Sequence, residues 1–583
     1  MKKGFDNIGE FIAALEGAGE LRRVAEEVSA EIGISKITDA ESKKPGGGKA
    51  LLFENVSGSA FPVATNLFGS DRRMSMALGV PSLARAGDRI EELARLSPPR
   101  SFSDIIETAR RILPLASIFP MKYRGRLAPC QEVVKTGADV DLSEMPVLKC
   151  WPGDAGRFVT LPVVFTKSPD GKTRNAGMYR LQIFDRNTTG MHWHIHKDGA
   201  HFYHRYRELG RRMEVAVAIG CAPAAMYAAT APLPRDVDEM MLAGFFRRGP
   251  VRMVKCKTID MEVPAESEFV LEGYVEPGEL RLEGPFGDHT GYYSLADMYP
   301  VFHVTALTRR AKPVYCATLV GPPPMEDCYM AKATERIFLP LLKSLFPEIS
   351  DYFLPWEGVF HNIAVVSIKK EYPAQAQRLI SGLWGQGQMS FCKAIVVVDE
   401  DVNPSNLREV WSRFVENFDF GADRMESYGV LDVLDHSSPD AVRGAKIGID
   451  LTRRLPGEPE RRQFRFPQIP EAAEAAAAAG VPDGDAAVFG RFCAVRMDKA
   501  GASGRDILSE MASSPAFQAF KAVAVFDPSV DISNPSKMLW KIFNNVDPSR
   551  DIISRGLTCF VDACSKNAAD GHSREWPQEL SFD

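Results

Sequence analysis

The chain has 583 residues, a net charge of −6, 45% hydrophobic residues and 25% charged residues. This composition is typical of a globular protein and excludes a disordered or fibrous chain. The slight excess of acidic residues gives no general attraction to nucleic acid or to an anionic membrane. No apolar run is long enough to span a membrane, and the first residues lack the apolar core of a secretion signal. Ten scattered cysteines without a CxxC pair indicate reduced thiols, so we expect a cytoplasmic protein.

Residues 1–115 have the pattern of an α/β domain. Apolar spacing over 11–24 predicts a helix that ends near Gly17–Gly19. The run ALLFENV predicts a strand over 50–56, and the segments 74–80 and 89–96 predict helices.

Residues 116–325 are β-rich. Short apolar runs recur between Gly, Pro and Asp, and the clearest are 158–166, 213–220, 268–275 and 299–308. A helical pattern is confined to EMMLAGFF at 239–246. Many short strands with polar turns predict a barrel or a sandwich.

Residues 326–460 alternate helix and strand, which predicts a second α/β domain. The last segment, 461–583, begins with a linker and an Ala-rich helix and then resembles 363–424. Ala364 aligns with Ala494, and Lys393 aligns with Lys521. We interpret this as a degenerate duplication, with chance similarity of two α/β units as the alternative.

Half of the histidines gather in GMHWHIHKDGAHFYH, at His192, His194, His196, His201 and His204. If MHWHIH is a strand, the first three share one face. They would then contact a metal or cofactor, lie on a polar surface, or bond to carbonyls inside a barrel.

Glu239 begins a predicted helix. Its carboxylate would either favour the helix dipole or act as a metal ligand beside the histidines. Asn oxygen, His nitrogen and Glu oxygen together suit manganese or magnesium better than zinc.

The sharpest local feature is the loop EGPFGDHTGY, which carries Glu283 and Asp288. A Gly- and Pro-rich turn that fixes two carboxyl groups favours general acid–base chemistry, and solvated acids in a turn are the alternative. An arginine between the two acids would lower both pKa values, whereas burial would raise them. Phosphate-loop, dinucleotide, nucleophile-elbow and zinc-protease motifs are absent from the sequence.

Taken together, the motifs resemble the UbiD family of prenylated-flavin-dependent decarboxylases and carboxylases. The resemblance covers about residues 1–455 and rests on separated motifs in family order, among them GSDRR (69–73), NAGMYRLQ (175–182), GMHWHIHK (190–197), PLPxxxxE (232–239), EGPFGDHTGYY (283–293), VGPPPMED (320–327), KAIVVVDEDV (393–402) and LDHSS–AKIGID (434–450).

The resemblance implies an α+β multidomain fold. We predict an N-terminal α/β domain (1–115), a central split β-barrel that binds the flavin (116–325), a C-terminal α/β oligomerisation domain (326–460) and the partly duplicated α/β extension (461–583). It implies prenylated FMN, supplied by a separate flavin prenyltransferase, with Mn²⁺ (or Mg²⁺) and K⁺. A homodimer or a higher homo-oligomer is expected, with no nucleic-acid partner and no membrane span.

The resemblance also assigns the site. The metal ligands would be Asn175, His196 and Glu239. Further residues would line the flavin or reach its phosphate: Met178, Tyr179, Arg180, His192, Trp193, His194, Lys197 and Lys393. Asn175 and Arg180 have opposite parity on a regular strand, so we expect a bulge between them or Asn175 on the entering loop.

Catalysis would use Arg180 as the clamp for the substrate carboxylate, Asp288 as the proton donor and Glu283 as its partner. The implied reaction is reversible, non-oxidative decarboxylation of a hydroxyaryl or polycyclic aromatic acid through a covalent adduct with the prenylated flavin. His436 would line the substrate pocket or lie at a domain interface.

Three alternatives stay open. The same site could carboxylate an unactivated polycyclic arene with CO₂. The barrel could belong to an FMN reductase, which leaves the paired acids unexplained. The chain could be an inactive scaffold subunit of a larger carboxylase. We further expect the extension to pack on the C-terminal domain and to alter assembly or gate the pocket.

Overall fold

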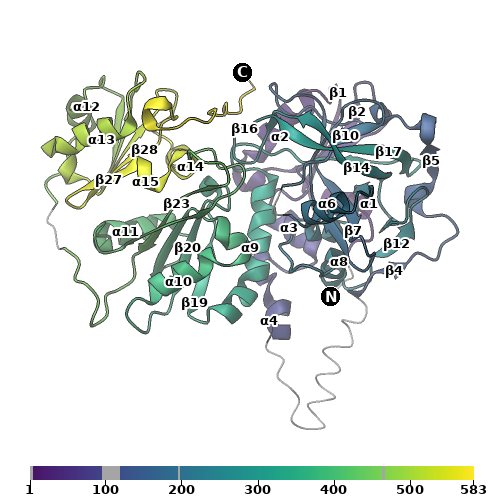
Figure 1. Ribbon diagram of the computed structural model, residues 1–583, viewed down its shortest axis with the longest axis horizontal. Helices are drawn as coiled ribbons and strands as arrows, with labels where there is room; N and C mark the ends of the chain where they lie inside the picture. Colours follow the sequence, from purple (N-terminus) through teal and green to yellow (C-terminus); the bar gives the residue numbers. More distant parts are fainter. Residues whose placement is uncertain (1–3, 95–117, 195–196, 463–465, 583) are drawn as a thin grey trace, which may run out of the picture. The chain divides into compact units, whose positions relative to one another are not determined.

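The computed structural model describes residues 4–94, 118–194, 197–462 and 466–582. The chain forms two compact units, Met1–Ile337 with Gln578–Asp583, and Phe338–Pro577. Figure 1 labels their elements. Among the described helices, none has both the length and the apolar composition that a membrane crossing needs. No disulfide joins any of the ten cysteines.

The N-terminal part of the first unit is an α/β layer, as predicted. Its sheet has the order β1-β2-β3-β18, formed by Leu21–Val28, Ala50–Val56, Val63–Thr65 and Tyr315–Cys316. The expected helices are present as α1 (Ile8–Gly17), α3 (Asp71–Leu78) and α4 (Asp88–Ala94), and α2 (Gly33–Ser42) lies between the first two strands. Asn7 and Ser70 cap α1 and α3 by accepting backbone N–H bonds, which fixes where these helices begin.

A seven-stranded sheet organises the centre of the first unit. Its order is β10-β17-β14-β11-β7-β8, with β5 also on β17, from Thr188–Gly190, Asp297–Arg309, Phe269–Glu283, Met213–Ile219, Pro162–Lys167, Arg174–Gly177 and Val133–Thr136. Every pairing in it is antiparallel. Within the described residues the sheet does not close on itself. The predicted fold class, a mixed α/β multidomain chain, is confirmed, while the domain boundaries remain predictions.

Short two- and three-stranded sheets surround this central sheet. They consist of β4 (Met121–Lys122), β12 (Arg252–Lys255) and β13 (Glu262–Pro264), of β6 (Phe158–Val159) and β9 (Leu181–Gln182), and of β15 (Phe286–Gly287) and β16 (Tyr293–Ser294). The expectation of one helical segment here is wrong. Besides α8 (Glu239–Arg247), the chain forms α6 (Asp198–Glu208) and α7 (Pro223–Ala228). α6 buries Phe202, Tyr203 and Tyr206. This apolar face is hard to recognise in the sequence, because polar residues and histidines interrupt the aromatic ones.

The second unit contains two sheets of the same topology (Figure 1, green and yellow). One has the order β19-β20-β21-β23-β22, the other β24-β25-β26-β28-β27. The first copy consists of β19 (Ile349–Phe353), β20 (Ile363–Ile368), α10 (Gln375–Trp384), β21 (Ala394–Asp399), α11 (Leu407–Asn417), β22 (Arg424–Val430) and β23 (Arg443–Asp450). α9 (Glu326–Leu345) precedes it and includes the point at which the chain leaves the first unit.

The second copy begins with α12 (Ala472–Ala479) and continues with β24 (Ala486–Phe489), β25 (Phe492–Arg496), α13 (Gly504–Ser513), β26 (Ala522–Phe526), α14 (Pro535–Asn545), α15 (Pro548–Asp551), β27 (Ile552–Arg555) and β28 (Thr558–Asp562). Lys393 and Lys521 occupy equivalent positions in the two copies. The Lys393 carbonyl accepts a hydrogen bond from Ile447 N in β23, and the Lys521 carbonyl accepts one from Cys559 N in β28, the matching strand. The predicted alignment of Ala364 with Ala494 is wrong by one residue. Strand register pairs Ile363 with Ala394 and Phe492 with Ala522, so Cys493 matches Ala364.

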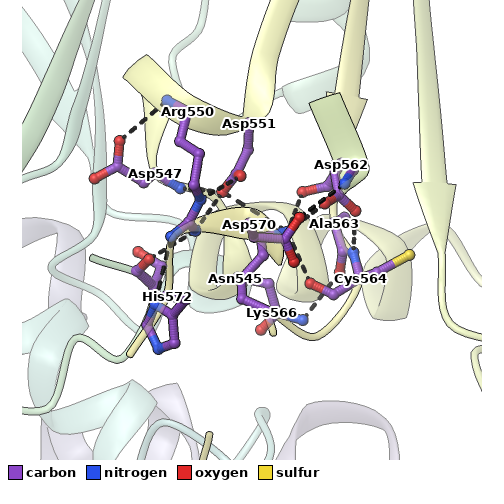
Figure 2. Close-up of polar contacts among 12 residues, drawn as sticks. Asn545, Asp547, Arg550, Asp551, Asp562, Ala563, Cys564, Lys566, Asp570 and His572 are labelled. Carbon is purple, nitrogen blue, oxygen red and sulfur yellow. Dashed lines mark hydrogen bonds and ion pairs between the residues drawn. The ribbon is translucent and has the colours of Figure 1, made fainter. Parts of the chain in front are cut away.

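Both copies also retain a buried lysine between two acids. Lys370 Nζ donates to Glu458 at 2.7 Å and lies 3.8 Å from Asp450. At the equivalent place in the second copy, Lys499 Nζ donates to Asp562 at 3.0 Å and to Asp570 at 2.8 Å. Figure 2 shows Asp562, Asp570 and the neighbouring Lys566 of the second copy. Equivalent ionic contacts in equal folds support duplication over chance similarity.

Candidate active site

The loop between β14 and β16 carries the two predicted acids. Glu283 is the last residue of β14, and Asp288 follows the short strand β15. Gly284 has φ of +92°, a backbone conformation that favours glycine at this exit from the strand. The turn beyond is closed by two backbone bonds, from Asp288 N to Tyr292 O at 3.1 Å and from Gly291 N to Asp288 O at 3.0 Å.

Arg180 joins the two acids. Its Nε donates to Glu283 Oε1 at 3.1 Å, its Nη1 donates to Asp288 Oδ2, and its Nη2 donates to Ser294 Oγ at 2.9 Å. The guanidinium also lies 4.6 Å from the centre of the Phe286 ring. Three residues that the sequence singled out therefore form one ionic group, in which both acids are buried and the Arg180 side chain is 9% exposed, although 103 residues separate Arg180 from Glu283.

The chain leaves the sheet before it reaches Arg180. Strand β8 ends at Gly177, residues 178–180 belong to no strand, and β9 then pairs with β6 instead of β7. Asn175 is inside β8, opposite Thr166. The break removes the parity conflict between Asn175 and Arg180, because the two residues do not share a regular strand.

The ionic group sets the charge of both acids. Burial raises the pKa of Glu283, but the hydrogen bond with His192 and the charges of His192 and Arg180 outweigh it, so the pKa lies below its usual value. Burial also raises the pKa of Asp288, and here the hydrogen bond with His289 and the Arg180 charge hold it far below the ordinary range. Both acids are therefore carboxylates while Arg180 pairs with them.

His192 extends this group. Its Nδ1 lies 2.7 Å from Glu283 Oε1, its Nε2 lies 2.7 Å from His194 Nε2, and its ring stacks on Tyr299 with centroids 4.2 Å apart. Burial lowers the pKa of the His192 imidazole. Residues 191–194 are not a strand, so the condition for strand alternation is not met in the described part of this segment, although His192 and His194 contact each other.

Asn175 and Glu239 meet beside the start of α8. Asn175 Nδ2 donates to Glu239 Oε1 at 2.8 Å, and the Ala176 backbone N–H donates to Oε2 at 2.8 Å. Asn175 Oδ1 is buried and has no hydrogen-bond partner among the described residues, and burial raises the pKa of Glu239 to about 7. An unsatisfied amide oxygen next to a buried carboxyl group fits a hard divalent cation. Such a cation would be bound by the amide oxygen of Asn175 and would favour the ionised form of Glu239.

The third predicted metal ligand, His196, lies outside the described residues. Among the residues that the structure does describe, no group of three or more His, Cys, Asp and Glu has the geometry of a metal site. Two of the three expected metal ligands, Asn175 and Glu239, are thus in contact.

The remaining flavin-lining candidates of the first unit flank this region. Gly199 N donates to Tyr179 Oη at 3.4 Å, and Met178 N donates to Ala229 O at 3.0 Å. Within the part of the chain that the structure describes, the buried Trp193 Nε1 and Glu283 Oε2 have no hydrogen-bond partner. Lys197 is exposed at the start of α6. Buried polar atoms without partners call for an explanation, and a bound polar ligand or ion is one.

Lys393 and His436 belong to the second unit. Lys393 Nζ donates to Asp435 Oδ2 and Ser437 Oγ, both at 2.8 Å. His436 is buried against Asn545, with its Nε2 3.2 Å from Oδ1, and burial lowers the pKa of His436 to about 3. Their predicted contacts with the flavin phosphate and the substrate remain predictions.

Asp154 is a site residue that the sequence did not reveal. Its Oδ2 accepts the N–H groups of Cys150 and Trp151 at 3.0 and 2.9 Å, and its Oδ1 accepts that of Gly287 at 2.7 Å. The carboxylate therefore fixes the backbone next to Asp288. The only available signal was its place in the Gly- and Pro-containing run WPGDAG, which does not reveal a partner 133 residues away.

Family models match most of the chain. The N-terminal, Rift-related and C-terminal domain models of the UbiD family, described as 3-octaprenyl-4-hydroxybenzoate carboxy-lyase, match residues 12–93, 122–323 and 328–451 with 466–572. The C-terminal model matches in two segments, one in each of the two copies described above.

Individual relatives agree. An uncharacterised protein of Archaeoglobus fulgidus is 48% identical over 462 residues, which cover 79% of this chain and 94% of that protein. An uncharacterised protein of Helicobacter pylori is 35% identical over an alignment of 593 residues, which covers 98% of this chain and 94% of that protein.

Solved structures of UbiD-class enzymes share the fold. The closed vanillic acid decarboxylase of Sedimentibacter hydroxybenzoicus has a TM-score of 0.70 at 26% identity, covering 81% of this chain and 97% of that one. HmfF of Pelotomaculum thermopropionicum, solved with FMN, has a TM-score of 0.66 at 30% identity, covering 79% and 97%. On the matched domain models and these relatives, the chain belongs to the UbiD family of carboxy-lyases.

Proposed function

We propose that the chain catalyses the reversible, non-oxidative decarboxylation of an aromatic carboxylic acid on prenylated FMN. The observation that carries this proposal is the buried group in which Arg180 bonds both Glu283 and Asp288. The fold neighbours support the cofactor and the substrate class, since one is a vanillic acid decarboxylase and HmfF was solved with FMN and, in an evolved dimeric form, with prenylated FMN.

The cofactor would lie between the two parts of the candidate site. Asn175 and Glu239, together with His196, would hold Mn²⁺ (or Mg²⁺) at its phosphate, with K⁺ nearby. Met178, Tyr179, Trp193 and His194 would line it, and Lys197 and Lys393 would approach it. When bound, prenylated FMN supplies the covalent attachment point and electron sink that loss of CO₂ from an sp² carbon requires.

Arg180 would bind the substrate carboxylate. Its planar fork matches two carboxylate oxygens, which the point charge of a lysine cannot do. The substrate carboxylate then competes with Asp288 for the guanidinium. Once that pairing weakens, Asp288 keeps its hydrogen bond with His289 but loses the charge of Arg180 as a cause that lowers its pKa. Because burial raises the pKa, this loss would favour uptake of a proton by the carboxyl group.

Asp288 would then donate this proton to the carbon that has lost CO₂. Glu283, fixed by His192 and Arg180, would stay ionised and hold the guanidinium in place. In the reverse direction the Asp288 carboxylate would accept the proton that an arene loses on carboxylation. A hydroxyaryl or polycyclic acid is the proposed substrate, with His436 near its ring, and a homo-oligomer in the cytoplasm is the proposed form of the enzyme.

Mass spectrometry of the bound flavin tests the proposal first. The protein would be co-expressed with a flavin prenyltransferase and purified without oxygen or light. We expect a flavin heavier than FMN by a C5 prenyl unit, stoichiometric manganese, and decarboxylation of at least one hydroxyaryl acid in a panel. A loaded, metal-replete protein that neither decarboxylates the panel nor exchanges solvent deuterium into the corresponding arenes would refute it.

A further inference from the structure

The segment Gln578–Phe582 follows the second unit in sequence but belongs to the first compact unit. It pairs with the loop that carries Asp288. Tyr293 N donates to Gln578 O and Leu580 N donates to Gly291 O, both at 2.9 Å, and Tyr292 forms an antiparallel bridge with Glu579. Leu580 is buried in the core of this unit.

These bonds complete the turn around Asp288. On its inner edge, Asp288 N donates to Tyr292 O and Gly291 N donates to Asp288 O. On its outer edge, the bonds to Gln578 and Leu580 occupy the N–H group of Tyr293 and the C=O group of Gly291. The short strand β16, which contains Tyr293, pairs over only two residues with β15. Such a short pairing has little stability of its own, so the added segment contributes much of its order.

The ring of Phe582 supports the same loop from another side. It stacks on Trp151 with centroids 4.2 Å apart and planes 22° apart. Trp151 in turn lies against Gly287, where a Cβ would come within 2.2 Å of its Cδ1. Trp151 Nε1 donates to Val320 O at 2.9 Å, which fixes the indole. Phe582 thereby limits the movement of the ring that abuts the residue before Asp288.

We propose that Gln578–Phe582 is a positioning segment of the candidate active site. It holds the backbone of 287–293 so that the Asp288 carboxylate stays in the reach of Arg180. The contacts given above join the segment to the backbone of 291–293 and to Trp151, so its effect on the rate would act through the position of Asp288. The structural part of this inference is independent of the reaction, and its effect on the rate rests on the proposed function.

Two variant pairs in the full chain test it. Leu580→Pro removes the N–H that Gly291 O accepts, and Leu580→Ala keeps that N–H while losing the side chain. Phe582→Ala removes the ring, whereas Phe582→Tyr keeps an aromatic ring at this position. Phe489→Ala, which removes a 39%-exposed ring in the second copy, is the control for losing a phenylalanine. Hydrogen–deuterium exchange of peptides covering 284–294 gives a readout that needs no substrate.

We expect exchange in 284–294 to be about tenfold faster in Leu580→Pro than in Leu580→Ala, and faster in Phe582→Ala than in Phe582→Tyr, with β7 and β11 unchanged. In the loaded enzyme kcat should fall about tenfold in Leu580→Pro and Phe582→Ala with little change in KM, and Phe582→Tyr should restore it. Equal exchange within each pair would overturn the inference, as would faster exchange with unchanged kcat. Failure of the proposed function is seen separately, as an inactive wild-type enzyme.

Discussion

Arg180 donates a hydrogen bond to Asp288, so the residue proposed to bind the substrate carboxylate is paired, before substrate binds, with the residue proposed to donate the proton. The hydrogen bond with His289 and the charge of Arg180 together hold the pKa of Asp288 below its ordinary range. In the proposed mechanism, substrate binding and protonation of Asp288 would be coupled, since the same guanidinium would pair with both carboxylates in turn.

Arg180→Lys tests the clamp. A lysine keeps the positive charge but loses the fork, so we expect kcat/KM for decarboxylation to fall about a hundredfold or more. Steady-state kinetics on the loaded enzyme measure this. Retained flavin and manganese would show that the cofactor site is intact, and an unchanged kcat/KM would exclude Arg180 as the clamp.

Asp288→Asn tests the proton donor. An amide cannot deliver a proton, so kcat should fall about 10²- to 10⁴-fold. Incorporation of solvent deuterium into the decarboxylated product should slow by the same factor. Asp297→Asn, at an exposed position opposite Glu283 in the β14–β17 pair, is the matched control and should leave both rates near those of the wild type.

Glu239→Gln tests the cation site. The change keeps the volume of the side chain but removes the charge that a divalent cation needs, so manganese content and flavin retention should fall at least tenfold. Elemental analysis of the purified protein gives the metal content. Glu262→Gln, a more exposed acid 3.9 Å from Arg174, should retain both. Full metal occupancy in Glu239→Gln would contradict the assignment.

Asp154 gives a pH prediction. Burial raises its pKa to about 6 despite three backbone N–H bonds, whereas the unfolded carboxyl group titrates near 4. Between these values the folded chain holds a proton that the unfolded chain has lost, so the stabilisation is complete below about pH 4 and is lost as the pH rises through about 6. This group should lower the free energy of unfolding by up to about 1.4 kcal/mol per pH unit in that window.

Urea unfolding of the wild type and Asp154→Asn between pH 4 and 7 measures this contribution. The pH dependence of the free energy of unfolding should lack this contribution in Asp154→Asn. Asp260→Asn, at an exposed position, should keep the pH dependence of the wild type. Parallel curves for wild type and Asp154→Asn would show that the carboxyl group is not protonated in the folded chain.

Lys499→Met tests the buried ion group of the second copy. Removal of the base leaves Asp570 without its ion pair, whereas Asp562 keeps one with Lys566 at 2.9 Å. We therefore expect a loss near the lower end of about 3–5 kcal/mol in the free energy of unfolding of the second copy. Lys370→Met should have a similar effect in the first copy. Lys172→Met, at an exposed position, should cost little. Adding Asp570→Asn to Lys499→Met should recover part of the loss, because it removes one unpaired charge.

Local sequence patterns predicted several parts of the structure correctly. The helix that starts at Glu239 and the strand over 50–56 follow from apolar spacing and flanking polar residues, which act over a few positions. The equivalence of Lys393 and Lys521 was visible because both copies keep the same order of elements. The one-residue error at Ala364 arose because a repeated Ala cannot fix strand register, which backbone pairing does.

The sequence by itself determined which residue types the site contains and the order of the elements that carry them. Only the tertiary structure decided that the strand breaks between Gly177 and Leu181, that Asp154 holds Gly287, and that Gln578–Phe582 pairs with 291–293. Each of these depends on backbone hydrogen bonds or on contacts between segments more than a hundred residues apart. Such contacts leave no periodic pattern in the chain, because any residue can supply the N–H and C=O groups that form them.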